Sequence, residues 1–164
     1  IAVTLAKKLP TALITGVDIS EQALEVAEKN SNYHGVANNL RFQKSDLLEN
    51  VTGAFDVIVA NLPYIGEEKY NFVSRETKAF EPHVALFGGP DGLLLYEKLF
   101  SQLKLVSYKP NLLIGEFGFL QAEAMSQLLN KFFVQESWRI IKDLASIERV
   151  FVVASSPEFL SFYD

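Results

Sequence analysis

The sequence contains no cysteine, and its 164 residues include only one methionine, one tryptophan and two histidines. Without cysteine, neither a disulfide framework nor a thiolate metal site can form. His34 and His83 each lack a second histidine or an acidic partner at the spacing that metal ligands require. We therefore predict no metal site.

Long apolar runs and basic stretches are missing as well. No apolar run approaches the roughly 20 residues of a membrane-spanning helix, and no basic region followed by a cleavage site opens the chain. We expect a cytoplasmic protein without a membrane partner. The formal net charge is −5, whereas a nucleic-acid substrate usually requires a basic face. The composition therefore disfavours nucleic acid as the direct substrate, and it leaves the oligomeric state open.

The chain also opens without a glycine-rich loop. Residues 1–8 have the pattern of an amphipathic helix, with no capping residue and no strand before it. In nucleotide-binding α/β folds, a strand and a glycine-rich loop precede the corresponding helix, and Gly88-Gly89 comes too late in the chain to replace them. We therefore expect residues 1–164 to be one domain that is truncated at its N-terminus.

What is present is an alternation of strand and helix patterns with 49% apolar residues, enough for a substantial core. Buried strands separated by helices predict an α/β fold with a mostly parallel sheet covered on both faces. The last two strands follow each other without a helix, which predicts an antiparallel strand at one edge. The expected strands are 12–18, 40–44, 55–60, 111–117, 138–142 and 149–154, and the expected helices are 20–34, 92–107 and 120–132. Residues 65–90 have little regular pattern, which is typical of a functional loop.

The tetrapeptide Asn61-Leu62-Pro63-Tyr64 directly follows the strand predicted at 55–60. The Asn61 side-chain oxygen is a hydrogen-bond acceptor, and Pro63 favours an extended backbone at Leu62 that turns its carbonyl into a second acceptor. Tyr64 supplies a ring for stacking. Two acceptors that converge on one NH2 group suit methylation of an amide or of an exocyclic amine. Taken alone, the four residues fit a strand that ends in a proline turn equally well.

Several motifs together resemble the glutamine methyltransferases of peptide chain release factors, the HemK/PrmC type. That family has a strand ending in Asn-Pro-Pro-Tyr, to which residues 61–64 are similar. It continues with Glu-Pro, a short spacer, Ala-Leu and a glycine-rich segment before Asp-Gly-Leu, and residues 81–93 match this most specific signal. Residues 113–118 resemble its strand ending in Glu-Ile-Gly, and residues 142–150 resemble its closing Asp-Leu…Arg-Val pattern. The resemblance covers essentially the whole chain.

This resemblance implies a class I, Rossmann-like methyltransferase catalytic domain that uses S-adenosyl-L-methionine. It also implies the reaction, which is methyl transfer to the side-chain amide of a glutamine in the Gly-Gly-Gln motif of a peptide chain release factor. The protein partner would then be a release factor, and the role would lie in translation termination. Asn61, Leu62, Pro63 and Tyr64 are the expected catalytic residues.

The resemblance assigns cofactor contacts to Asp18, Ile19, Asp46, Leu47 and Asn61. Asp18 ends a predicted strand, where open α/β sheets bind ligands, and its carboxylate can accept from both ribose hydroxyls. Asp46 follows the next strand and is expected to face the adenine amino group, with Leu47 packing on the ring. A helix-capping aspartate at Asp18 and a solvated turn at Asp46 are the structural alternatives.

Two further segments are assigned to the surroundings of the site. Residues 81–82 and 88–92 are expected to form a shaped loop beside it, although Pro90-Asp91-Gly92 is also a standard turn sequence. Glu116 and Asp143 lie at predicted strand ends, where both a place in the cleft and a structural role fit.

Three alternatives stay open. Leu62 replaces the family's first proline, and Asn-Leu-Pro-Tyr is the form common in ribosomal RNA adenine dimethylases, so an RNA adenine methyltransferase is one alternative. A DNA adenine enzyme is less favoured, because no basic recognition region is visible. The third is an inactive fragment, because the family's N-terminal helical domain, first strand and glycine-rich loop are expected to be absent. That strand lies mid-sheet, and its loss leaves costly unpaired backbone groups on two neighbours.

Overall fold

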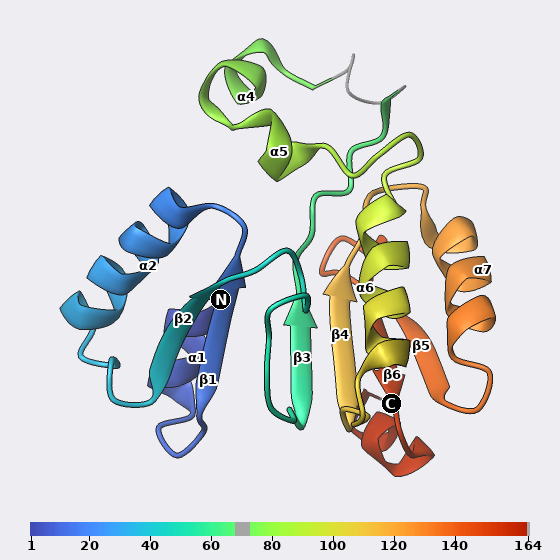
Figure 1. Ribbon diagram of the computed structural model, residues 1–164. Helices are drawn as coiled ribbons and strands as arrows, with labels where there is room; N and C mark the ends of the chain where they lie inside the picture. The colour runs from blue at the N-terminus through green and yellow to red at the C-terminus, as the bar shows by residue number, and fades with distance from the viewer. Residues whose placement is uncertain (68–72, 164) are drawn as a thin grey trace. The chain divides into compact units, whose positions relative to one another are not determined.

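The computed structural model describes residues 1–67 and 73–163 (Figure 1). The chain forms two compact units, Ile1–Gly53 and Ala54–Asp164. Each unit is an α/β arrangement with a β-sheet of its own.

The first unit is a parallel strand pair with two helices. Its elements are α1 (Ala2–Lys8), β1 (Ile14–Asp18), α2 (Glu21–Tyr33) and β2 (Leu40–Lys44). The strands pair in parallel, with Asp18 opposite Lys44, so their carboxyl ends lie together. Helix α2 begins where the Ser20 hydroxyl accepts a hydrogen bond from the Ala23 N–H at 3.2 Å, and Gly35 follows its end with φ of 68°. These are the usual start and stop signals of a helix.

One face of the β1–β2 pair carries the apolar core of this unit. Alternate residues of paired strands point to the same face, which here brings Ile14 next to Leu40 and Gly16 next to Phe42. Ala6 of α1 packs into this cluster and is 1% exposed. A side chain at Gly16 would collide with the Phe42 ring. Glycine at this position therefore lets the phenylalanine lie across the strand.

The second unit is built on a four-stranded sheet in the order β3-β4-β6-β5 (Figure 1). Its elements are β3 (Val57–Ala60), α4 (Arg75–Phe80), α5 (His83–Leu86), α6 (Leu94–Leu105), β4 (Leu112–Glu116), α7 (Ala122–Phe132), β5 (Ser137–Lys142), β6 (Glu148–Ala154) and the 3-10 helix η1 (Pro157–Tyr163). Strands β3 and β4 are parallel, and β6 is antiparallel to both of its neighbours. The predicted antiparallel pairing at a sheet edge is thus present. The strand that runs against the other three is β6, one position in from the edge strand β5.

Helices cover both faces of this sheet. Helices α6 and α7 bury Tyr96, Phe100 and Met125, each 1% exposed or less. Tyr96 and Phe100 both meet the Phe151 ring of β6, with centroids 5.2 and 5.7 Å apart. The residues of β6 on either side of Phe151 point to the opposite face of the sheet. There, Leu160 of η1 packs against them and against residues of β4. The parallel pairing of β3 with β4 places their carboxyl ends side by side.

Two expectations about the elements were wrong. The strands predicted as buried, 12–18 and 55–60, are partly exposed, with Val17 at 37%, Val57 at 47% and Val59 at 42%. Within the described residues, β1 pairs only with β2 and β3 only with β4, so each is an edge strand. The stretch 65–90 also contains the helices α4 and α5. With six and four residues, they are too short to produce a recognisable helical period.

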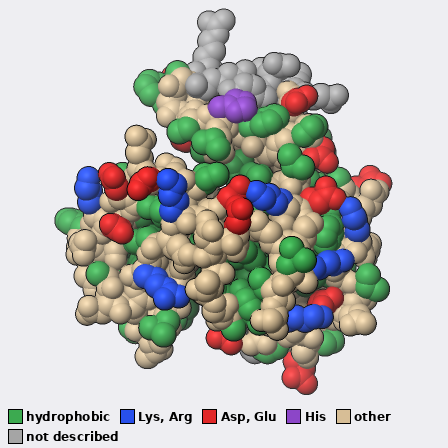
Figure 2. Space-filling model, viewed as in Figure 1, with side chains coloured by type: hydrophobic (Ala, Val, Ile, Leu, Met, Phe, Trp, Pro, Cys, Tyr) green, Lys and Arg blue, Asp and Glu red, His purple; other side chains and the backbone are tan. Residues whose placement is uncertain are grey.

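Charged side chains of both signs are interspersed on the face drawn in Figure 2. Among the described residues of that face, lysine and arginine do not gather into one continuous basic patch. No helix within residues 1–67 and 73–163 is both long and apolar enough to cross a membrane.

Candidate functional site

The tetrapeptide of residues 61–64 lies directly beyond the carboxyl end of β3. Asn61 is exposed, and the three residues after it are half-buried. Within the described residues, no hydrogen bond occupies the Asn61 side-chain amide or the Leu62 carbonyl oxygen. Both acceptors that the sequence predicts are therefore available to a ligand.

Tyr96 anchors the chain just before the tetrapeptide. Its side chain is fully buried, and its hydroxyl donates to the main-chain carbonyls of Ala60, at 3.2 Å, and Glu116. Burial raises the pKa of Tyr96, so the hydroxyl stays protonated and remains a donor. The contact ties the end of β3 to the end of β4.

The Tyr64 ring is oriented by a hydrogen bond from its hydroxyl to Glu116 Oε1, at 3.2 Å. Burial raises the pKa of Tyr64, and the negative charge of Glu116 raises it further. Glu116 therefore lies beside the predicted site, in contact with one of its expected catalytic residues.

The glycine-rich segment wraps around the exit of the tetrapeptide. Ile65 donates its N–H to the Leu86 carbonyl at 3.0 Å and accepts from the Gly88 N–H at 2.9 Å. A side chain at Gly88 would clash with the Pro63 carbonyl, and one at Gly92 would clash with the Tyr64 carbonyl. Of the expected loop, residues 88–92 lie against the tetrapeptide, and their glycines allow the close approach of two backbones. Residues 81–82 join α4 to α5.

Gln121 joins three segments of this unit and was not among the residues that the sequence singled out. Its side-chain NH2 donates to the carbonyls of Tyr64 and Asp91, both at 2.9 Å, and its oxygen accepts from the Gly118 N–H at 2.6 Å. The side chain is buried, with 4% of the residue exposed. A glutamine three residues after a strand-end glycine was the available signal. Nothing in the sequence pointed to a role for Tyr96, because an aromatic residue at its position on α6 is expected simply to pack in the core.

The two carboxylates predicted to contact the cofactor, Asp18 and Asp46, lie at or just beyond the neighbouring carboxyl ends of β1 and β2. The Ser45 N–H donates to the Asp18 carbonyl at 3.1 Å, so Asp46 follows immediately beside the end of β1. Asp18 Oδ1 accepts from the Ser20 N–H at 2.8 Å, which is the helix-capping contact of the structural alternative. Leu47 has the positive φ of 55°, an uncommon backbone conformation for leucine. Ile19 is 51% exposed next to Asp18.

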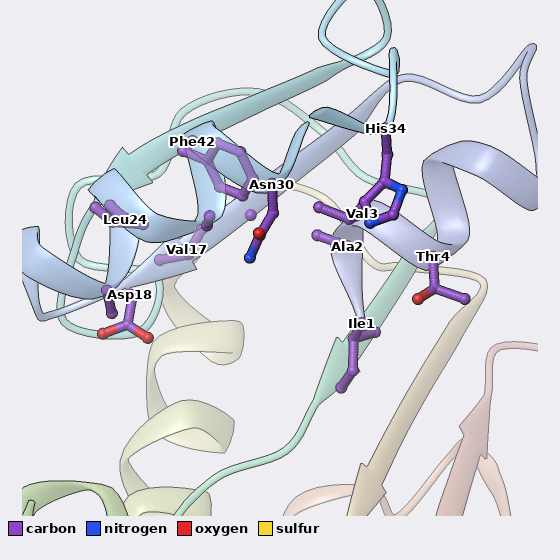
Figure 3. Close-up of a pocket in the computed structure, with 13 residues that line it drawn as sticks. Ile1, Ala2, Val3, Thr4, Val17, Asp18, Leu24, Asn30, His34 and Phe42 are labelled. Carbon is purple, nitrogen blue, oxygen red and sulfur yellow. The ribbon is translucent and has the colours of Figure 1, made fainter. Parts of the chain in front are cut away.

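A cavity of about 450 Å³ lies in the first unit between α1, β1 and α2 (Figure 3). Asp18 lines it, whereas Ile19, Asp46 and Leu47 do not. In Figure 3, Asp18 lies at the opposite end of the drawn residues from Thr4 and His34. The cavity thus reaches only one of the predicted cofactor residues. Asn61, the fifth of them, belongs to the second unit.

Comparison with known proteins gives consistent matches. Residues 1–79 match the family described as the methyltransferase small domain. The release factor glutamine methyltransferase of Koribacter versatilis is 34% identical over 93% of this chain and 53% of its own length. That of Bacillus subtilis is 36% identical over 91% of this chain and 52% of its own length. The chain therefore spans about half the length of these curated relatives.

A solved structure supports the fold independently. The ribosomal protein L11 methylase from Lactobacillus delbrueckii subsp. bulgaricus superposes with a TM-score of 0.61 at 22% identity, covering 93% of this chain and 62% of that protein. Over more than nine-tenths of its length, the chain is thus similar in sequence to release factor glutamine methyltransferases, as its motifs predicted, and it has the α/β fold of a class I S-adenosylmethionine-dependent methyltransferase.

Proposed function

We propose that the protein transfers a methyl group from S-adenosyl-L-methionine to the side-chain amide of a glutamine in a peptide chain release factor. The observation that carries the proposal is the 34% identity to a release factor glutamine methyltransferase over 154 residues, which include both units. The expected target is the glutamine of the Gly-Gly-Gln motif. A release factor is then the protein partner, and the cytoplasm is the expected location.

The acidic groups of the first unit fit the cofactor by the chemistry of their side chains. The ribose hydroxyls and the adenine amino group of S-adenosylmethionine are hydrogen-bond donors, and carboxylates accept from them. Asp18 and Asp46 lie at neighbouring strand ends, and within the described residues Asp18 Oδ2 has no hydrogen-bond partner. Asp18 would hold the ribose and Asp46 the adenine amino group, with further contacts from Ile19 and Leu47. Asn61 is the cofactor contact proposed for the second unit.

When bound, S-adenosylmethionine would supply a sulfonium methyl group as the electrophile, whose S–C bond breaks as the new N–C bond forms, with a neutral thioether as the leaving group. A glutamine side-chain nitrogen is a poor nucleophile, because its lone pair is delocalised into the amide carbonyl. The Asn61 side-chain oxygen and the Leu62 carbonyl would accept its two N–H bonds. Holding both N–H bonds in fixed directions favours a pyramidal nitrogen whose lone pair is free to form the new N–C bond.

The remaining steps need no covalent intermediate. The nitrogen becomes cationic once it carries the methyl group, and it then loses a proton to solvent, so a strong general base is unnecessary. Tyr64 would flank the substrate amide, with its ring held by the hydrogen bond to Glu116. Leu62 acts through its backbone carbonyl, so its difference from the family's proline leaves the acceptor in place.

The proposal is tested by incorporation of labelled methyl groups with the longest natural polypeptide that carries this sequence. The substrates are a release factor, the same factor with asparagine in place of the target glutamine, ribosomal RNA and DNA. We expect labelling of the unaltered release factor alone. Labelling of RNA or DNA, and not of the factor, would reject the proposal and favour an adenine methyltransferase with the same tetrapeptide.

The role of Asn61 is tested in the same assay. Asn61→Ala removes one acceptor, and we expect kcat to fall about 10²- to 10³-fold, as when one preorganised polar group is removed from other active sites. Asn130→Ala, which changes an exposed asparagine on α7, is the matched control and should retain full activity. Equal activity of both variants would remove Asn61 from the mechanism.

A further inference from the structure

The tetrapeptide is fastened at both ends by buried side chains. Before it, the Tyr96 hydroxyl holds the Ala60 carbonyl at 3.2 Å. At its end, the Gln121 amide holds the Tyr64 carbonyl at 2.9 Å. Asn61 and Leu62, which carry the two acceptors of the proposed reaction, lie between these fastened points.

The orientation of the Gln121 amide follows from its three partners. Two of them are carbonyl oxygens, which require the NH2 group, and the third is the Gly118 N–H, which requires the oxygen. With the residue 4% exposed, water does not replace any of these bonds. Exchanging the amide for a carboxylate would turn two attractive contacts into repulsive ones.

The chain around Gln121 is shaped to admit this side chain. Leu120, immediately before it, adopts a φ of 66° and is 76% exposed, a costly arrangement for an apolar residue. A side chain at Gly118 would approach Gln121 Oε1 to 2.6 Å, and one at Gly92 would clash with its NH2 group. The two glycines thus leave room for the Gln121 amide.

We infer that Gln121 is a positioning residue for methyl transfer: by holding the Tyr64 carbonyl, two residues after Leu62, it restricts the movement of the tetrapeptide and so the direction of the Leu62 carbonyl. Pro63 has a fixed φ, which removes one of the backbone rotations between the Leu62 carbonyl and the Tyr64 carbonyl. Gln121 also binds the Asp91 carbonyl, and therefore connects the glycine-rich loop to the end of the tetrapeptide. This inference rests on the proposed function.

The test uses Gln121→Glu and Gln121→Met, which keep the length of the side chain. Neither variant can donate two hydrogen bonds at neutral pH. A misplaced acceptor weakens the transition state more than substrate binding, so we expect kcat to fall about 10²-fold with little change in KM for the release factor. Gln127→Glu, the same change at an exposed position of α7, is the control and should leave both constants unchanged.

The pH dependence separates positioning from simple packing. A buried glutamate that faces two carbonyls has a raised pKa, and its protonated form can donate one hydrogen bond and accept the bond from Gly118. We expect the activity of Gln121→Glu relative to the unaltered protein to recover as the pH is lowered, whereas Gln121→Met should show no such recovery. If Gln121→Glu does not fold, the kcat and KM of Gln121→Met decide.

Several outcomes would overturn the inference. They are full activity of Gln121→Met, a loss confined to KM, or a loss in Gln121→Glu that is independent of pH. Absence of methyl transfer to the release factor by the unaltered protein would instead refute the proposed function. The two failures are therefore distinguishable in one assay.

Discussion

Tyr64 donates a hydrogen bond from its hydroxyl to Glu116 across 3.2 Å, joining the segment after β3 to the last residue of β4. The two residues are 52 positions apart in the chain. Because β3 and β4 are parallel neighbours, their carboxyl ends meet, and a tyrosine beyond one strand can reach a carboxylate on the other. The ring that is expected to flank the substrate amide therefore has a defined direction.

Removing this hydrogen bond should lower activity modestly. Tyr64→Phe keeps the ring but loses the hydrogen bond that orients it, which is worth about 1 kcal/mol. If the transition state loses that amount, kcat should fall about fivefold. Tyr64→Ala also removes the flanking surface and should lose considerably more. Steady-state kinetics with the release factor provide the comparison, and equal losses in the two variants would show that the ring itself has no role.

The charge of Glu116 should be visible in the titration of Tyr64. Burial and the Glu116 carboxylate both raise the pKa of Tyr64. In Glu116→Gln, the charge is gone while an acceptor remains, so we expect the pKa of Tyr64 to move back toward its ordinary value. NMR of ring-labelled tyrosine measures it, with Tyr64→Phe identifying the signal. An unchanged pKa would mean that burial alone causes the shift.

Tyr96 should make the protein sensitive to alkali. Burial raises its pKa in the folded state, so above pH about 10 the unfolded chain loses the tyrosine proton while the folded protein retains it. Stability is therefore full below that pH and is lost as the pH rises further. Tyr96→Phe should flatten this alkaline decline, while costing about 1–3 kcal/mol at neutral pH because the Ala60 and Glu116 carbonyls lose the hydroxyl proton that they share. Urea unfolding at several pH values measures the loss of stability at neutral pH and its decline at alkaline pH. An equal alkaline decline in Tyr96→Phe and the unaltered protein would contradict the assignment.

Gly92 should tolerate no side chain. Its φ is +83°, and a Cβ there would clash with the Tyr64 carbonyl. Gly35 is the matched control, because its φ is +68° but no atom lies within 4 Å of the position that a Cβ would occupy there. We expect Gly35→Ala to cost about 1–2 kcal/mol of backbone strain and Gly92→Ala to cost more and to lower kcat. Thermal unfolding and the methylation assay measure these two effects. Equal stability and equal activity of the two variants would contradict the prediction.

The ion pair between Lys109 and Glu136, at 2.7 Å, should contribute to stability only above acidic pH. Burial tends to raise the pKa of Glu136, but the hydrogen bond and charge of Lys109 outweigh it, and the pKa is lowered. A lowered pKa means that the stabilisation is present above the unfolded value, near 4.3, and is lost as the pH falls through the folded one. Glu136→Gln should cost about 0.5 kcal/mol at pH 7 and nothing at low pH. Glu123→Gln, an exposed change on α7, serves as the control.

Much of the fold could be predicted because its signals are local. The strand at 40–44 was predicted with the observed bounds, and the helix predicted at 20–34 occupies Glu21–Tyr33, because Ser20 and Gly35 mark its ends. The short helices α4 and α5 were missed, since six and four residues carry too little periodicity. The exposure of Val57 and Val59 was missed because it depends on which strands pair with β3.

The sequence by itself determined the alternation of strands and helices, the tetrapeptide after β3 and the resemblance to release factor glutamine methyltransferases, because these reside in short runs of neighbouring residues. Only the tertiary structure decided that Tyr96 and Gln121 hold the two ends of that tetrapeptide. Their hydrogen bonds link positions 36 and 57 residues apart. Such contacts form only once strand pairing has brought the carboxyl ends of β3 and β4 together, because their partners lie far apart in the sequence.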